Sequence, residues 1–113
     1  MNAAEVVSGW GREQFAGLTI HERVKKVTNR LAQSGYRVTR LTLPPGLFSS
    51  LEYVPYPFLT GCETGLALML LGEKVPLFPR YDDSRFVRFE FYKIGEAQML
   101  QALEIDLDPP KVE

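Results

Sequence analysis

The chain has 113 residues, of which 45% are hydrophobic and 24% are charged, and its net charge at pH 7 is −1. This composition is typical of one globular domain, and a single cysteine, Cys62, excludes an internal disulfide framework. The near-neutral charge gives no strong attraction to polyanions, and no apolar run approaches the roughly 20 residues that a membrane-spanning helix needs. Because the N-terminus also lacks a signal-peptide pattern, we expect one cytoplasmic domain over residues 1–113.

The charge is unevenly distributed along the chain. Residues 21–40 contain six basic side chains and one acid, whereas residues 95–113 contain five acids and one base. Two ends of opposite charge favour association, including self-association, while two separately solvated faces are the alternative. The pattern gives a first reason to expect a binding partner.

The first predicted elements are helices. Residues 2–8 carry a short helix signal ahead of Trp10, which stands between two glycines. Thr19 and Glu22 then form the pattern of a capping box, and apolar residues recur behind them at helical spacing. We therefore predict one main amphipathic helix over about 20–34.

A strand and a proline-rich stretch follow this helix. Residues 36–43 alternate and are rich in β-branched and aromatic types, which predicts a strand that ends at two prolines. Residues 46–53 have the apolar content of a short helix. Residues 54–58 contain two further prolines, each of which restricts its own backbone and that of its neighbour. This last segment is predicted to be a stiff extended connector.

Residues 65–78 predict a β-hairpin. The apolar run over 65–71 has the length of a buried strand, with a helix as the alternative. Residues 72–74 would form a tight turn, and residues 75–78 would return as the second strand. Because Pro76 has no N–H to donate to a ladder, the return strand is predicted to lie at a sheet edge.

Residues 85–93 are the most informative segment, because four Phe and Tyr residues alternate there with charged ones. In a strand these side chains would divide between two faces. The first face is an ordinary core face and comprises Val87, Phe89 and Phe91. The second face mixes aromatic rings with charge and comprises Phe86, Arg88, Glu90 and Tyr92. A mixed face of this kind suits contact with a partner.

The last predicted elements are a short helix over 96–102 and a strand over 103–107. Together the elements predict an α+β fold with a mostly antiparallel sheet of four to five strands. The helix over about 20–34 would pack on one face of the sheet, and the other face would be only partly covered.

The residues that could carry chemistry form no catalytic pattern. Cys62 and His21 are the only thiol and imidazole, and no spacing brings them together. The acids at 82–83 and 104–108 lack both His partners and calcium-loop spacing, and no Gly-rich phosphate loop is present. We therefore expect a protein that is not an enzyme and that uses no metal or cofactor.

A protein-contact surface needs the fewest assumptions, because aromatic and Arg side chains dominate interface hot spots. The expected contact residues are Phe86, Arg88 and Tyr92, with Trp10, Tyr56, Phe58 and Phe78 as further candidates. The competing interpretation is that a second layer of the same chain covers these side chains.

Single-stranded nucleic-acid binding on the strand 85–93 is the alternative function. Aromatic rings on RNA-recognition sheets stack on bases, and Arg37 and Arg40 could contact phosphates here. Glu90, in the middle of the same face, and the near-neutral total charge weigh against this interpretation.

The segments Leu71-Gly72-Glu73-Lys74-Val75-Pro76 and Leu43-Pro44-Pro45-Gly46 resemble elements of small proteins that are common in tailed-bacteriophage genomes. Those proteins often carry a Leu/Met-Gly-x-Pro-Val-type hairpin, whereas the order here is Val75-Pro76. The resemblance covers residues 43–93 and implies a virion-associated or host-interacting accessory role, without functional residues. We therefore expect a phage- or mobile-element-encoded assembly module that binds a protein or a second copy of itself, in the host cytoplasm or the virion.

Overall fold

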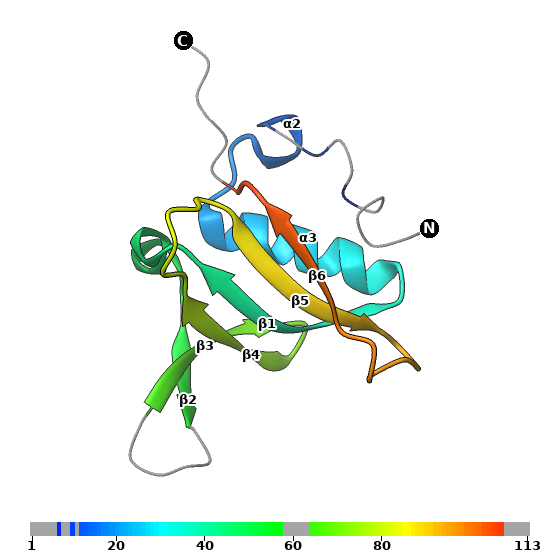
Figure 1. Ribbon diagram of the computed structural model, residues 1–113. Helices are drawn as coiled ribbons and strands as arrows, with labels where there is room; N and C mark the ends of the chain where they lie inside the picture. The colour runs from blue at the N-terminus through cyan, green and yellow to red at the C-terminus, as the bar shows by residue number, and fades with distance from the viewer. Residues whose placement is uncertain (1–6, 8–9, 11, 58–63, 108–113) are drawn as a thin grey trace.

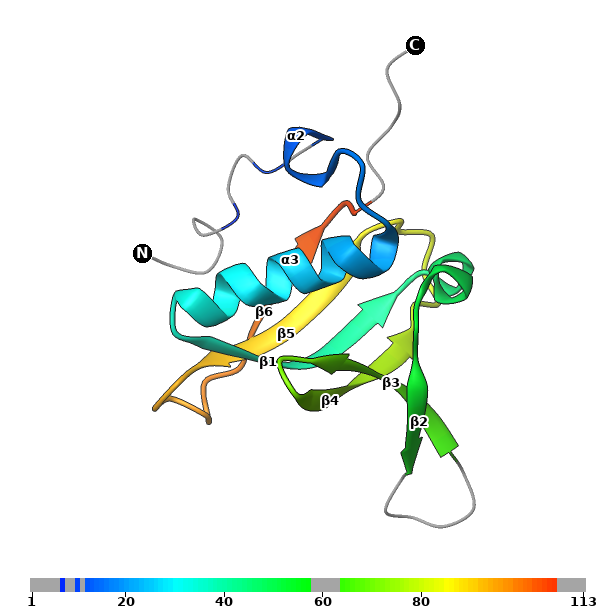
Figure 2. The same cartoon turned by 180° about the vertical axis from the view of Figure 1, so that it is seen from behind.

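The computed structural model describes residues 7, 10, 12–57 and 64–107, in which one sheet is covered on one side by a helix (Figure 1). The elements in chain order are α2 (Arg12–Phe15), α3 (Ile20–Gln33), β1 (Tyr36–Leu43), η1 (Pro45–Ser50), β2 (Val54–Pro57), β3 (Thr64–Leu70), β4 (Glu73–Pro79), β5 (Val87–Lys93) and β6 (Gln101–Ile105). The strand order is β2-β3-β4-β1-β5-β6, and of these neighbours β1 and β4 run parallel while the rest are antiparallel. Figure 2 shows α3 crossing one face of the sheet.

The α+β class and the mostly antiparallel sheet are confirmed, but the sheet has six strands rather than four or five. The additional strand is β2, which occupies the segment predicted to be a connector and pairs with β3. Two prolines are tolerated there because β2 is an edge strand. The helix predicted over 46–53 is the short helix η1, and the one predicted over 2–8 falls almost entirely outside the described residues.

Helix α3 begins where the capping pattern predicts it. The Thr19 hydroxyl accepts a hydrogen bond from the Glu22 N–H (3.1 Å), and the Glu22 carboxylate accepts one from the Thr19 N–H (2.9 Å). These bonds lower the pKa of the Glu22 carboxyl below its ordinary value. Val24, Val27 and Leu31 follow on one side of the helix and are fully buried in the core. The predicted main helix is therefore confirmed.

Strand β5 supplies the centre of the core, as predicted from its alternation. Val87, Phe89 and Phe91 are at most 1% exposed. The Tyr36 ring of β1 packs edge-on against the Phe91 ring, with 5.5 Å between the ring centroids. Burial of these large side chains fixes which face of the sheet α3 covers.

The helix predicted over 96–102 is wrong. Gly95, at φ +96°, opens a run of turns, and the chain then enters β6, where Ala102 pairs with Glu90 of β5. A helix of this length has little stability of its own, so pairing with β5 overrides the local propensity.

The edge position predicted for residues 75–78 is also wrong, because β4 lies between β3 and β1. The ladder between β1 and β4 covers only Leu41 to Leu43 against Leu77 to Pro79. Pro76 therefore stands just before this ladder, where β4 has no partner on its β1 side.

Before this ladder, β1 and β4 leave an unpaired stretch inside the sheet. Residues 36–38 and 40 of β1 pair with β5 but not with β4, and a register shift between Val38 and Arg40 marks a bulge. An ion pair between Arg37 and Glu73 (2.7 Å) spans the two strands. We term the unpaired stretch between residues 36–40 and 73–76 the open seam.

Candidate protein-contact surface

The face of the sheet opposite α3 carries the charged and aromatic side chains, and no described element packs on it (Figures 1 and 2). We term it the uncovered face. Its members alternate along each strand with the buried core residues. They include Arg37, Arg40, Tyr56, Met69, Lys74, Phe78, Arg88, Glu90 and Tyr92. The internal layer that was the competing interpretation is absent from the part of the chain that the structure describes.

Arg40 lies at the centre of the uncovered face and links three strands. Its guanidinium carbon is 3.7 Å from the centroid of the Phe78 ring on β4. Its Nε lies 3.4 Å from a carboxylate oxygen of Glu90 on β5. A planar cation stacked on a ring and held by a carboxylate is a pre-organised contact group, because fewer rotamers are lost when a partner binds.

A hollow of about 520 Å³ opens on the same side, over the open seam. Arg37, Thr39, Lys74 and Tyr92 are among its lining residues. Arg88 stands on the same face of β5, four residues before Tyr92; it is exposed and makes no ion pair among the described residues. The face thus offers a depression lined by the Tyr92 ring and by cations, together with the positive charge of Arg88, which pairs with none of the described carboxylates.

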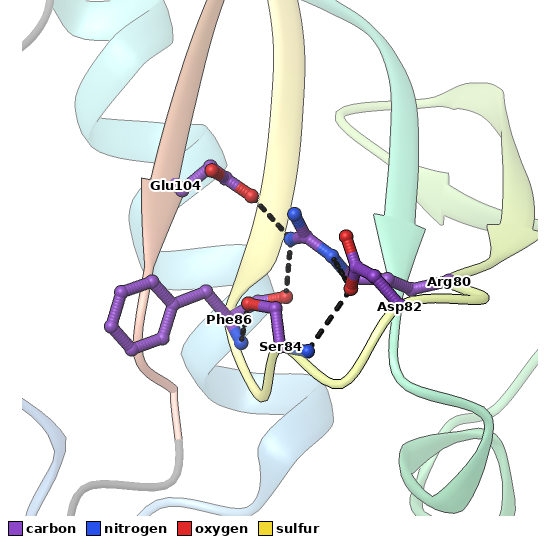
Figure 3. Close-up of polar contacts among 5 residues, drawn as sticks. All are labelled: Arg80, Asp82, Ser84, Phe86 and Glu104. Carbon is purple, nitrogen blue, oxygen red and sulfur yellow. Dashed lines mark hydrogen bonds and ion pairs between the residues drawn. The ribbon is translucent and has the colours of Figure 1, made fainter.

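A polar cluster around Arg80 fixes the corner of the uncovered face (Figure 3). The Arg80 side chain is 12% exposed, and its guanidinium pairs with Asp82 (2.7 Å) and Glu104 and donates to the Phe86 carbonyl (3.0 Å). The Ser84 N–H donates to the Asp82 carboxylate (3.0 Å). These bonds tie the loop after β4 to β6, and Figure 3 shows the Phe86 ring pointing away from Arg80 toward β6.

The same cluster shifts two titrations in opposite directions. The hydrogen bond from Arg80, followed by that from the Ser84 N–H, lowers the pKa of Asp82 below its ordinary value of 3.8. The hydrogen bonds to Asp82 and Glu104 raise the pKa of Arg80. Arg80 and Asp82 are therefore both charged at neutral pH.

The structure brings most of the predicted contact residues to one region. Phe78, Arg88, Tyr92 and Tyr56 share the uncovered face, and Phe86, which is 40% exposed, lies at its corner. Trp10 lies elsewhere, and Phe58 lies outside the described residues.

Trp10 belongs to the helix layer and not to the uncovered face. Its ring packs edge-on against Phe15, with 6.0 Å between the ring centroids, and Lys26 Nζ lies 5.6 Å from the Trp10 centroid. It is partly buried against the core. The structure therefore gives Trp10 a packing role and separates it from the other candidates.

Four of the residues considered for chemistry have structural partners, namely His21, Asp82, Glu104 and Asp106. The nearly buried His21 accepts a hydrogen bond at Nδ1 from the Glu52 N–H (3.2 Å), and Cys62 lies outside the described residues. Asp106 pairs with Arg85 (2.6 Å), while Asp82 and Glu104 pair with Arg80 as above. Within the described residues no group of three or more His, Cys, Asp or Glu could hold a metal ion, and no helix is long and apolar enough to cross a membrane.

Two features of this surface were not predicted. The first is the bond between Arg80 and Asp82, although an Arg two residues before an Asp is a recognisable local pair. The contact of Arg40 with Phe78 depends on β1 and β4 being neighbours, which no local pattern indicates.

Comparisons with known protein families, curated proteins and solved structures find no match for this chain.

Proposed function

We propose that this protein is a non-catalytic module that binds another protein, or a second copy of itself, through the uncovered face. The observation that carries the proposal is the Arg40–Phe78 stack, flanked by exposed Arg88 and by the hollow beside Tyr92. Arg and aromatic side chains on a rigid sheet supply contact area at a low entropic cost.

Charge on the same surface favours protein over nucleic acid as the partner. Arg37 and Arg40, the side chains considered for phosphate contact, pair with Glu73 and Glu90. A phosphate backbone would have to displace these carboxylates or lie beside them, which costs binding energy through like-charge repulsion. A protein partner can match both signs of charge, so nucleic-acid binding remains the second interpretation.

The biological setting that we propose comes from the resemblance of residues 43–93 to small tailed-phage proteins. It supports a virion-associated or host-interacting accessory role, encoded by a phage or another mobile element. The hairpin that carries the resemblance is β3–β4, which also contributes Phe78 and Lys74 to the uncovered face.

Charge reversal on each side of the sheet tests the proposal. Arg88→Glu changes the uncovered face, and Lys25→Glu changes an exposed residue of α3 by the same charge. We expect Arg88→Glu to weaken association at least about tenfold, as loss of a hot-spot Arg does, and Lys25→Glu to leave it near wild type. Sedimentation velocity would measure self-association, and affinity capture followed by mass spectrometry would detect a different partner.

Three results would refute or redirect the proposal. A wild-type protein that stays monomeric and retains no partner contradicts it, as does equal weakening by both variants. Binding of a single-stranded oligonucleotide that falls steeply with salt and is lost in Tyr92→Ala would favour the nucleic-acid interpretation instead.

A further inference from the structure

Strand β6 forms one edge of the sheet, and no other described strand pairs with its outer side. Its pairing with β5 runs from Gln101 to Ile105 without a register shift. In an antiparallel pair of this kind every second residue turns its N–H and C=O groups away from the partner strand. The outer side of β6 therefore presents an unbroken row of backbone groups to which a further strand can bind.

The two edges of the sheet differ in how they are protected against such pairing. At the opposite edge, Pro55 and Pro57 occupy two of the four positions of β2, and a proline has no N–H to donate to an added strand. β6 contains no proline and no lysine, and no bulge twists it away from β5. Of the two edges, β6 is therefore the one that is open to a further strand.

The carboxylates at this edge have cations from their own chain. Glu104 pairs with Arg80, as Figure 3 shows, and Asp106, just after the strand, pairs with Arg85 at 2.6 Å. Residues 95–113 are rich in acids, but these two ion pairs compensate the carboxylates that lie nearest to the edge. A second edge of the same composition can therefore approach β6 without meeting two bare carboxylates.

Apolar side chains stand beside the free edge. Met99 and Leu100 immediately precede β6 and are 59% and 65% exposed. Leu103, in the middle of β6, is partly buried and packs against the core on the α3 side of the sheet. A strand added here would gain backbone hydrogen bonds and would also cover apolar surface, which are the two contributions that strand addition uses.

A second copy of β6 fits this edge best in one register. Two antiparallel edges related by a two-fold axis keep the same face of the sheet on the same side, so residues of one face lie opposite each other. When all of β6 overlaps, Leu103 lies opposite Leu103 of the second copy, and Ala102 lies opposite Glu104. The nearest alternatives overlap only over 101–103 or 103–105, and the latter sets Glu104 against its own copy.

We propose that β6 pairs antiparallel with β6 of a second copy, with Leu103 at the two-fold axis, so that the two sheets become one. Backbone hydrogen bonds and the contact between the two Leu103 side chains hold the pair. Small Ala102 side chains leave room for Glu104 of the other copy. The interface is the edge of the sheet, so the inference does not rest on the function proposed for the uncovered face.

Opposite charges at Leu103 test the proposal, because this residue meets its own copy and lies on the α3 side of the sheet. Leu103→Lys and Leu103→Glu should each weaken dimerisation at least about tenfold, since two like charges then meet at the axis. An equimolar mixture of the two variants should restore it, because Lys then meets Glu. Sedimentation velocity over a concentration series measures the three samples and wild type. Arg88→Glu, which changes the uncovered face, should leave this dimer intact.

Spectra of wild type supply a second measurement if the Leu103 variants fold poorly. In ¹H–¹⁵N spectra recorded at increasing protein concentration, the amides of residues 101–105 should shift saturably, whereas those of Arg40 and Lys74 should not. A dimer that shows these shifts and survives Arg88→Glu would support edge pairing and separate it from binding at the uncovered face.

Three results would overturn the proposal. The first is a wild-type protein that stays monomeric up to about 1 mM, where even a weak pair would form. The second is a mixture of folded Leu103 variants that associates no better than each variant alone. The third is a set of concentration-dependent shifts on the uncovered face without shifts in β6, which would assign self-association to the uncovered face instead.

Discussion

The same strands build both faces of the sheet, but the side chains on the two faces make different kinds of interaction. On β5, Val87, Phe89 and Phe91 are at most 1% exposed, whereas their neighbours Arg88 and Glu90 reach solvent to different degrees. The covered face is specified by apolar area and volume, which several side chains could supply. The uncovered face is specified by particular partners, such as a guanidinium on a ring. Side-chain identity therefore counts for more on the face that contributes less to stability.

The largest expected effect contrasts adjacent residues of β5. Phe89→Ala should lower the free energy of unfolding by about 3–5 kcal/mol, because it leaves a cavity in the core. Arg88→Ala should change it by no more than about 0.5 kcal/mol. Urea unfolding followed by circular dichroism measures both. Similar losses in the two variants would mean that the uncovered face is as important for stability as the core.

The second largest effect is expected at the corner of the uncovered face. Arg80→Ala removes a guanidinium whose side chain is 12% exposed and leaves Asp82 and Glu104 without their cation. It should destabilise the fold more than Arg37→Ala, which breaks a pair whose side chains are about half exposed, at 51% and 49%. Thermal unfolding at one ionic strength ranks the two variants, and the reverse order would contradict a structural role for Arg80.

The pH dependence of the same cluster follows from the lowered pKa of Asp82. Because its pKa in the folded state lies below the ordinary 3.8, its contribution to stability is present above that value and is lost as the pH falls through the folded pKa. Wild type should therefore be more stable than Asp82→Asn at pH 7, and the difference should shrink below about pH 4. Unfolding curves at a series of pH values test this, and a constant difference would exclude the ion pair as its cause.

A smaller effect is expected for the stack on the uncovered face. Arg40→Ala should cost about 0.5–1 kcal/mol, since the side chain is 47% exposed. Arg40→Lys keeps the charge but loses the planar stack, so it should recover only part of this loss. Repeating Arg40→Ala in a Phe78→Leu background completes a double-mutant cycle. Additive effects would show that the ring contact contributes no stability.

The smallest expected change is a gain in stability at the turn between β3 and β4. Leu71 and Gly72 both have positive φ, 52° and 80°, as a type I′ turn requires, and Asn-Gly is the preferred pair there. Leu71→Asn should therefore stabilise the fold by about 0.5 kcal/mol. Leu71→Ala removes the exposed side chain but keeps the strain, so it should give no gain. A gain in stability in both variants would show that removal of the exposed Leu71 side chain, and not relief of backbone strain, causes the effect.

Local patterns predicted the elements whose signals lie within a few residues. The capping box of α3 and the two faces of β5 are of this kind, since side-chain spacing alone decides them. The prediction for Pro76 failed because it assumed that a strand is paired or unpaired along its whole length. The uncovered face was predicted through β5, but no local pattern indicated which strands flank β5 in the sheet.

The features that local patterns missed depend on contacts between distant segments. Arg40 meets Phe78 only because β4 joins β1 in parallel after a hairpin, and Arg80 is held by Glu104 from the last strand. Thr28 follows the spacing of an ordinary helix residue, yet its Oγ1 is buried and has no hydrogen-bond partner among the described residues.

The central place of β1 has a consequence for the order in which this chain folds. β2, β3 and β4 form one antiparallel unit and β5 and β6 another, each joined by local connections, and both meet the rest of the sheet through β1. Local hairpins form quickly, whereas contacts between distant segments carry a larger entropic cost of loop closure. We therefore expect that docking of the two units onto α3 and β1 limits the folding rate, and that pairing of β4 with β1 completes the sheet.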